Sequence, residues 1–300
     1  MGLMIWLFRI GAGIAGVIGI GLTAIYIYQE KLLYVPVVPG MPKDAWIPAE
    51  RYGLASQDAE VESADGVKLH AWLLTDPTWS PEFIRSRPVI LFFQENAGNM
   101  SFRLPFFKGL IQALDCPIFA VSYRGYGKSQ GRPNEKGLKL DAEAGLRHLL
   151  KRQDVDGSRV VVFGKSLGGA VAIFLAAAYQ EKLKGLIIEN TFTSVEDMVG
   201  SVLPPLGPLI GAGKPLNRLV TNKWYSLKTI PKIDKLPILM LSSGEDEMVP
   251  PSQMKELRAA QKSPTCKFVE FPTAGHMNAY DADPTRYWMA VAEFVTLYTL

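Results

Sequence analysis

The order of apolar and polar positions changes regularly along most of the chain. Short runs rich in β-branched and aromatic residues predict strands at 88–94, 117–123, 159–164, 183–190, 237–243 and 266–271. Longer stretches with helical or small-residue patterns predict helices at 101–114, 138–152, 167–179, 252–260 and 284–299. Strands that alternate with helices predict an α/β fold, with a mostly parallel sheet covered by helices on both faces.

Two segments before this alternation have patterns of their own. Residues 59–74 hold two runs of strand formers around Asp65-Gly66, which predicts a hairpin. Residues 32–58 hold four prolines and little periodicity. We therefore expect a stalk over 32–58, followed by a single folded domain over 59–300.

The amino-terminal segment is apolar without interruption. Residues 10–28 carry no charge, and their number is about that needed to cross a bilayer core. The exit at Tyr26-Ile27-Tyr28 is a poor signal-peptidase site and suits a membrane interface. We expect an uncleaved single-pass anchor within residues 1–31, and a cleaved signal peptide is the alternative. The flanking charges barely favour either side of the membrane.

The same segment matches a dinucleotide-binding fingerprint, with glycines at positions 11, 13 and 16. A crossover helix needs a polar face, and residues 14–25 offer only Thr23. The distance to a second strand is also too short, so this interpretation is rejected. Gly11, Ala15 and Gly19 recur at a spacing found where membrane helices pack together, although a glycine-rich anchor without a partner explains it as well.

The regular alternation is broken at 191–236, a segment rich in proline, glycine and large apolar residues. It is too long for an ordinary connection. We expect a lid-like insertion, and an excursion packed on the sheet edge is the alternative.

Composition excludes several classes of protein. The net charge is +3, from 32 basic and 29 acidic residues, and no dense basic run is present, so we expect no nucleic acid partner. Cys116 and Cys266 lie far from each other in sequence and from any histidine cluster. Two free thiols are favoured over a disulfide, and we expect neither a metal nor a cofactor.

Gly164-Lys165-Ser166-Leu167-Gly168 stands between a predicted strand and a predicted helix. A phosphate-binding loop would need a glycine five residues before Gly164, and Arg159 occupies that position. A nucleophile elbow instead places a serine at a sharp strand-to-helix turn, where side chains at the flanking positions would collide. Ser166 is therefore the candidate nucleophile.

A serine hydroxyl needs a base, and the chain has only three histidines. In this type of fold the order is serine, acid, histidine, and only His276 follows both Ser166 and the later strands. His70 and His148 precede the serine and are assigned structural roles.

The acid should follow a strand that lies between the serine and the histidine. Glu245, Asp246 and Glu247 follow the strand at 237–243, and Glu189 ends the preceding strand. Asp246 is favoured because it lies in the loop before the next helix. Its role would be to hold the tautomer of His276.

An oxyanion hole needs two backbone N–H groups. One would come from Leu167, directly after the nucleophile. The other should come from the loop 94–99, which follows the first buried strand.

The chain resembles the Bem46-like α/β-hydrolases, and within them the plant Wavy Growth 2 type. The resemblance covers nearly the whole chain and is carried by FFQENAGNM, SYRGYGKSQG, VVFGKSLGGAVA, IIENTFTS, GEDEMVPP and FPTAGHMN. It implies an α/β-hydrolase fold, Ser166 as nucleophile, Asp246 as acid, His276 as base and a single-pass anchor.

One position departs from many relatives. They carry His-Gly where this chain carries Gln94-Glu95, a form that the plant-type members share. A carboxylate at Glu95 would oppose an oxyanion if it pointed inward and would be harmless if it pointed outward. The second donor is then the N–H of Asn96, with Asn99 as a positioning group.

The expected activity is hydrolysis of an acyl ester, thioester or amide, and a lipid thioester on a protein is one candidate substrate. The expected partners are an acyl or lipid-like substrate and a membrane, either the endoplasmic reticulum or the plasma membrane. A weakly active or inactive signalling or scaffold protein with the same fold is the alternative, and a peptidase is a third candidate.

Overall fold

The structure, a computed structural model, describes residues 2–42 and 44–299, and for residues 3, 14, 15, 17 and 18 it describes the backbone alone. Within these residues eight strands form one sheet, in the order β1-β2-β4-β3-β5-β6-β7-β8. The strands are β1 (Ala55–Glu62), β2 (Lys68–Thr75), β3 (Val89–Phe93), β4 (Ile118–Val121), β5 (Val160–Lys165), β6 (Gly185–Glu189), β7 (Ile238–Ser243) and β8 (Cys266–Phe271).

The sheet is mostly parallel, as predicted. β2 pairs antiparallel with β1 and β4, whereas all pairs from β4 through β8 are parallel. The hairpin turns at Gly66, whose φ of 80° is readily adopted only by glycine. β1 begins at Ala55, within the segment expected to be a stalk, because residues 55–58 pair with β2 as well.

The longer helices match the expected stretches closely. The α-helices are α1 (Gly2–Leu33), α2 (Pro81–Ser86), α3 (Leu104–Leu114), α4 (Glu135–Lys151), α5 (Leu167–Tyr179), α6 (Val195–Val202), α7 (Ser226–Thr229), α8 (Pro251–Ala260), α9 (Ala279–Ala282) and α10 (Pro284–Thr299). Short 3₁₀ turns are η1 (Ala49–Tyr52), η2 (Met100–Arg103), η3 (Gln180–Lys182), η4 (Pro204–Leu206), η5 (Pro215–Leu219) and η6 (Ile230–Lys232).

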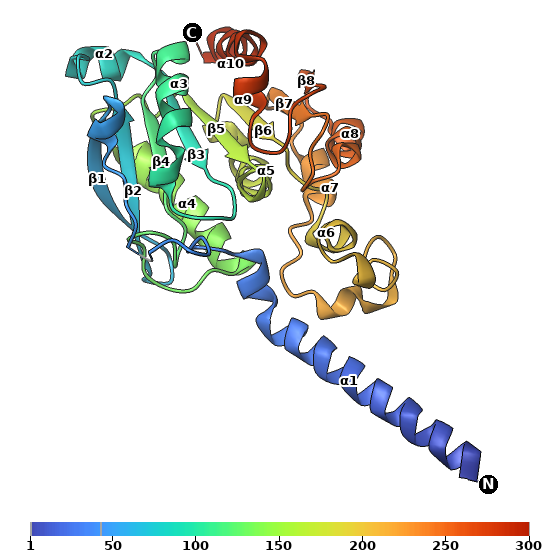
Figure 1. Cartoon of the computed structure of the whole chain (residues 1–300). Coiled ribbons are helices and arrows are strands. Elements are labelled where there is room, and N and C mark those ends of the chain that lie inside the picture. The colour runs from blue at the N-terminus through green and yellow to red at the C-terminus, as the bar shows by residue number, and fades with distance from the viewer. Residues whose placement is uncertain (1, 43, 300) are drawn as a thin grey trace.

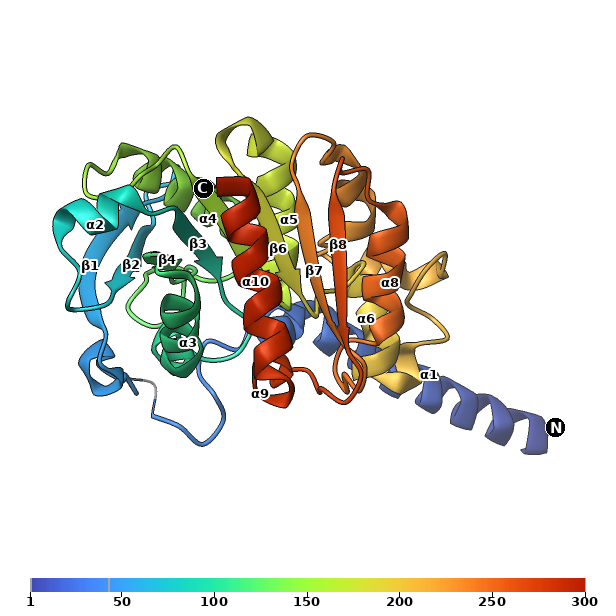
Figure 2. The same cartoon turned by 90° about the horizontal axis from the view of Figure 1, so that it is seen from above.

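Helices cover both faces of the sheet (Figures 1 and 2). α4, α5 and α8 pack on one face and α3 and α10 on the other. β5 shows why: Val160 and Val162 belong to the first core, and Val161 and Phe163 belong to the second. Alternate residues of a strand point to opposite faces, so an uninterrupted apolar run is buried on both.

The segment expected to form a lid consists mainly of short elements. Residues 191–236 contain α6, η4, η5, α7 and η6. Ser194 caps α6, because its side chain accepts a hydrogen bond from the N–H of Asp197. Helix α6 and the segment that follows it lie on the side of the body from which α1 extends, whereas α7 packs beside α5 and α8 (Figure 1).

Helix α1 extends away from the body of the molecule (Figure 1). Many of its apolar side chains are exposed, among them Ile20 at 73% and Ile27 at 64%. The expected membrane-spanning segment, 10–28, includes four positions whose side chains lie outside the described ones. Among the side chains that are described, no helix combines the length and hydropathy needed to cross a membrane.

Candidate active site

Ser166 lies at the turn between β5 and α5, at the carboxyl edge of the parallel strands. Its φ of 52° and ψ of −118° are far from ordinary strand or helix values. The turn is held from both sides: the Ser166 N–H donates to Glu189 O at 2.8 Å, and Thr191 Oγ1 donates to Ser166 O at 2.8 Å. Strain of this kind persists only where the surrounding structure over-determines it, which is frequent at functional sites.

The glycines around Ser166 are required by close backbone approach. A Cβ on Gly164 would lie 2.1 Å from Gly168 O. A Cβ on Gly168 would lie 2.0 Å from Phe93 O. The steric reason inferred from the sequence for both glycines is therefore confirmed.

The loops after β7 and β8 bring an acid and a histidine together. His276 Nδ1 lies 2.7 Å from Asp246 Oδ2, and both side chains are buried. The other carboxylate oxygen accepts the N–H groups of Met248 at 2.9 Å and Val249 at 2.7 Å. Because a carboxylate only accepts hydrogen bonds, Nδ1 carries the hydrogen and Nε2 is left as the basic nitrogen.

Asn190 fixes the histidine loop and was not identified from the sequence. Its Nδ2 donates to His276 O at 2.9 Å and to Ser243 Oγ at 2.9 Å. Glu247 adds a second tie, since its Oε2 accepts the His276 N–H at 3.0 Å. Asn190 directly follows Glu189 and has a φ of 46°, a conformation that asparagine tolerates better than most residues.

Among the described residues no hydrogen bond joins Ser166 to His276. In structures without substrate such bonds are often long and shorten in the substrate complex. The other two histidines lie elsewhere: His70 Nε2 lies 2.5 Å from Asp58 Oδ1 on the hairpin, and His148 stacks on Phe119. The arrangement can supply a nucleophile at a strained turn that lines a cavity and a histidine whose tautomer is set.

The candidate oxyanion donors come from two segments, the start of α5 and the loop after β3. Leu167 begins α5, so its N–H has no partner within the helix and lies at the positive end of the helix dipole. Asn96 lies in the loop after β3, where its carbonyl accepts the N–H of Val35 at 3.0 Å and the hydroxyl of Tyr126 at 2.8 Å. Its side chain donates to Leu33 O at 3.1 Å.

Glu95 is buried and is neutralised by two cations. Its Oε2 lies 2.5 Å from Arg103 Nε, and its Oε1 lies 3.8 Å from Lys165 Nζ. Burial alone would raise the pKa of Glu95, but the charges of Arg103 and Lys165 hold that pKa below its ordinary value. The Glu95 carboxylate is thus paired with two cations, which compensate the negative charge that would otherwise oppose an oxyanion.

Lys165 completes the same charge cluster. Its Nζ lies 3.1 Å from Glu189 Oε1 and 4.4 Å from the centre of the Phe106 ring. Burial alone would lower the pKa of Lys165, but Glu189 and Glu95 raise it above the ordinary value. The second oxygen of Glu189 accepts the hydroxyl of Tyr287. Glu189, the alternative acid, is therefore engaged with Lys165 and Tyr287, whereas Asp246 bonds the histidine.

Asn99 has a structural part in this loop. Its Oδ1 accepts the N–H of Ser101 at 3.0 Å and caps η2, and its Nδ2 donates to Ala45 O at 2.8 Å. Both ends of the side chain are thus occupied by the loop and the preceding segment.

Across the described residues no group of three or more histidine, cysteine or carboxylate side chains is placed to hold a metal ion.

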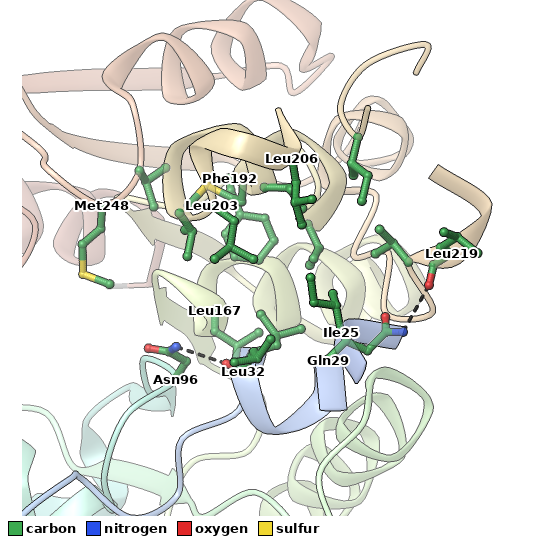
Figure 3. A pocket seen from close by; sticks show the side chains of 18 of the residues that line it. Ile25, Gln29, Leu32, Asn96, Leu167, Phe192, Leu203, Leu206, Leu219 and Met248 are labelled. Atoms are coloured by element: carbon green, nitrogen blue, oxygen red, sulfur yellow. Dashed lines mark hydrogen bonds between the residues drawn. The ribbon is translucent and has the colours of Figure 1, made fainter. Parts of the chain in front are cut away.

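A cavity of about 310 Å³ opens beside the serine. Ser166, Leu167 and Asn96 line it, and most of its other lining residues come from α1 and the insertion (Figure 3). Apart from Gln29, the side chains along these walls are apolar or aromatic. Such a cavity suits the apolar part of a small ligand.

Comparison with known proteins extends over almost the full chain. The model of the Prolyl oligopeptidase family matches residues 128–298. The Alpha/beta hydrolase domain-containing protein WAV2 of Arabidopsis thaliana is 45% identical over 293 residues, which cover 95% of this chain and 93% of WAV2. Protein bem46 of Schizosaccharomyces pombe is 39% identical over 92% of this chain and 88% of its own length.

More distant proteins are also similar, one in sequence and one in structure. The Saccharomyces cerevisiae protein named "Uncharacterized membrane protein YNL320W" is 31% identical over 94% of this chain and 94% of its own length. An esterase of Pyrococcus furiosus superposes with a TM-score of 0.70 over 89% of this chain and 98% of its own. At 18% identity that superposition shows the fold alone.

Proposed function

The chain belongs to the α/β-hydrolase family that includes WAV2 and Bem46, and from this we propose that it is a serine hydrolase that cleaves an acyl ester, thioester or amide. The observation that carries the proposal is the buried pair of His276 and Asp246 on the sheet edge at which Ser166 stands in a strained turn. Together these supply the parts of an acyl-transfer site.

In the proposed reaction Ser166 Oγ attacks the acyl carbonyl, and His276 Nε2 takes its proton. Asp246 keeps the imidazole oriented and stabilises the imidazolium that forms. The N–H groups of Leu167 and Asn96 receive the developing negative charge. His276 then protonates the leaving group, and a water molecule, deprotonated by the same histidine, releases the acid from the serine.

The proposed substrate carries an apolar acyl chain. The cavity beside Ser166 supports this choice, because its walls are apolar apart from Gln29 and because the serine itself lines it. A lipid thioester on a protein remains one member of this class. The match to the Prolyl oligopeptidase family gives a reason to include a peptide amide in the substrate panel.

We also propose that α1 holds the protein at a membrane. Residues 10–28 are uncharged, and the helix extends from the body with apolar side chains exposed. A large apolar surface of this kind is uncommon on a soluble monomer. One relative from yeast carries the name of a membrane protein.

A serine-directed fluorophosphonate probe tests the enzyme proposal. Membranes that carry the full chain should label at Ser166, and labelling should be lost in Ser166→Ala and greatly reduced in His276→Ala. Ser201→Ala, at an exposed serine of α6, is the matched control and should label like the unmodified chain. Equal labelling of Ser166→Ala would overturn the assignment, and an unlabelled but folded chain would favour the scaffold alternative.

A further inference from the structure

The carboxyl-terminal part of α1 belongs to the wall of the cavity beside Ser166. Leu22, Ile25, Gln29 and Leu32 line it, together with Tyr26 and Leu33. These positions are spaced by three and four residues, so they form one stripe along the helix. Ile27 points elsewhere and is 64% exposed, so the helix presents one stripe to the cavity and a second apolar face outward.

Helix α6 presents a matching stripe from the other side. Val195, Met198, Val199 and Val202 line the same cavity with the same helical spacing. Figure 3 shows side chains of α1 on one wall and those of the insertion, such as Leu203 and Leu206, opposite them. Two largely apolar stripes therefore face each other across a cavity that Ser166 also lines.

Polar contacts hold α1 and the residues that follow it to the insertion and to the loop after β3. Gln29 Nε2 donates to Leu219 O at 3.1 Å, and Gln29 Oε1 accepts the Thr221 N–H at 2.7 Å. At the helix end, Leu33 O accepts from Asn96 Nδ2, and Val35 forms a parallel bridge with Ala97. The helix is thereby joined to the insertion on one side and to the loop of the candidate oxyanion donor on the other.

We infer that α1 is part of the substrate site itself: a long acyl chain lies between α1 and α6 with its carbonyl at Ser166. This inference rests on the proposed function and adds the element that selects chain length. The occupant is an acyl chain because the walls from α1 and α6 are apolar apart from Gln29, whose amide is bonded to Leu219 and Thr221, and because Ser166 lines the same cavity. Since the outer face of α1 is also apolar, the chain enters from the lipid in which that face lies.

Paired substitutions on one helix test the inference. Ile25→Trp places a large side chain in the cavity, whereas Ile27→Trp makes the same change on the exposed face. The full-length variants are reconstituted in phosphatidylcholine vesicles and assayed with p-nitrophenyl butyrate and p-nitrophenyl palmitate. Ile25→Trp should lower palmitate hydrolysis at least about tenfold and leave butyrate hydrolysis within about twofold. Ile27→Trp should change neither.

Equal chain-length profiles for Ile25→Trp and Ile27→Trp would overturn the inference. A uniform loss of both esters in Ile25→Trp alone would also overturn it, because it would mean damage to the serine rather than to the chain site. If the unmodified chain hydrolyses neither ester, the proposed function fails and a binding measurement decides the site. Photoactivatable diazirine palmitate should then cross-link to peptides from 22–33 and 192–210, and this should be lost in Ile25→Trp but kept in Ser166→Ala. Cross-links confined to other segments would reject the site.

Discussion

Lys165 and Glu189 form a buried ion pair, with Nζ and Oε1 3.1 Å apart, and both flank the backbone of the candidate nucleophile. Lys165 directly precedes Ser166, and the carbonyl of Glu189 accepts the Ser166 N–H at 2.8 Å. Burying a charge pair has a desolvation cost, which is offset only when both charges have well-placed partners. Here Glu95 and Arg103 extend the pair into a cluster of alternating charge that joins β5, β6 and the loop after β3.

Removing the cation should destabilise the fold, because it leaves buried carboxylate charge uncompensated. Lys165→Met should lower the free energy of unfolding by about 3–5 kcal/mol. Adding Glu189→Gln should recover part of that loss, with a coupling energy of about 0.5–3 kcal/mol. Urea unfolding of the two single variants and the double variant measures the coupling. Strictly additive losses would show that the two groups do not interact.

Acid should weaken the structure through Glu95. Its pKa is lowered in the folded protein, so its contribution to stability is fully present above its ordinary value of 4.5 and is lost as the pH falls through the folded value. The stability gap between the unmodified chain and Glu95→Gln should therefore be largest near neutral pH and should narrow below pH 4.5. Urea midpoints at a series of pH values give this gap, and a gap independent of pH would contradict the assignment.

A methyl group at the elbow should not be tolerated. In Gly168→Ala the new Cβ would lie 2.0 Å from Phe93 O, so strand or helix has to move. We expect a loss of about 3 kcal/mol or more of unfolding free energy, or no folded protein. Gly200→Ala in α6 is the control, because its nearest neighbour would be 3.7 Å away, and it should be neutral or slightly stabilising. Thermal unfolding of both variants compares them, and similar midpoints would reject the steric explanation.

The two acids beside His276 should differ sharply in their effect on turnover. Asp246→Asn leaves the shape of the side chain but favours the wrong imidazole tautomer, and by analogy with other triads it should lower the rate about 10⁴-fold. Glu247 contacts only the backbone N–H of His276, so Glu247→Gln should keep the rate within about tenfold. Ester hydrolysis by purified full-length protein compares the two. Comparable losses of rate in the two variants would mean that Asp246 matters no more for turnover than Glu247.

The local features of this chain could be predicted from sequence because their causes are local. The strand at 159–164 lies within a residue of β5, and the helix at 167–179 coincides with α5. Both have continuous apolar runs that burial on two faces requires. The two glycines beside Ser166 signalled a tight turn, since few other residues allow such close backbone approach.

The surroundings of Glu95 could not be predicted in the same way, because they depend on strand register. β3 and β5 pair with Phe93 opposite Gly164, which brings the residues that follow each strand side by side. Register is set by the folded sheet rather than by either strand alone. The part of α1 in the cavity was missed for a similar reason: an uncharged helix gives no sign of which stripe meets the insertion.

The hydroxyl of Tyr34 donates to Asn222 Oδ1 at 3.0 Å and accepts from Trp224 Nε1 at 2.9 Å. Asn222 and Trp224 are translated 188 and 190 residues after Tyr34. During synthesis α1 is therefore made first, and the insertion that faces it arrives only after most of the sheet has been translated. The wall opposite α1 is completed late, so a nascent chain long enough to carry Ser166 still lacks part of the surface proposed to hold the acyl chain.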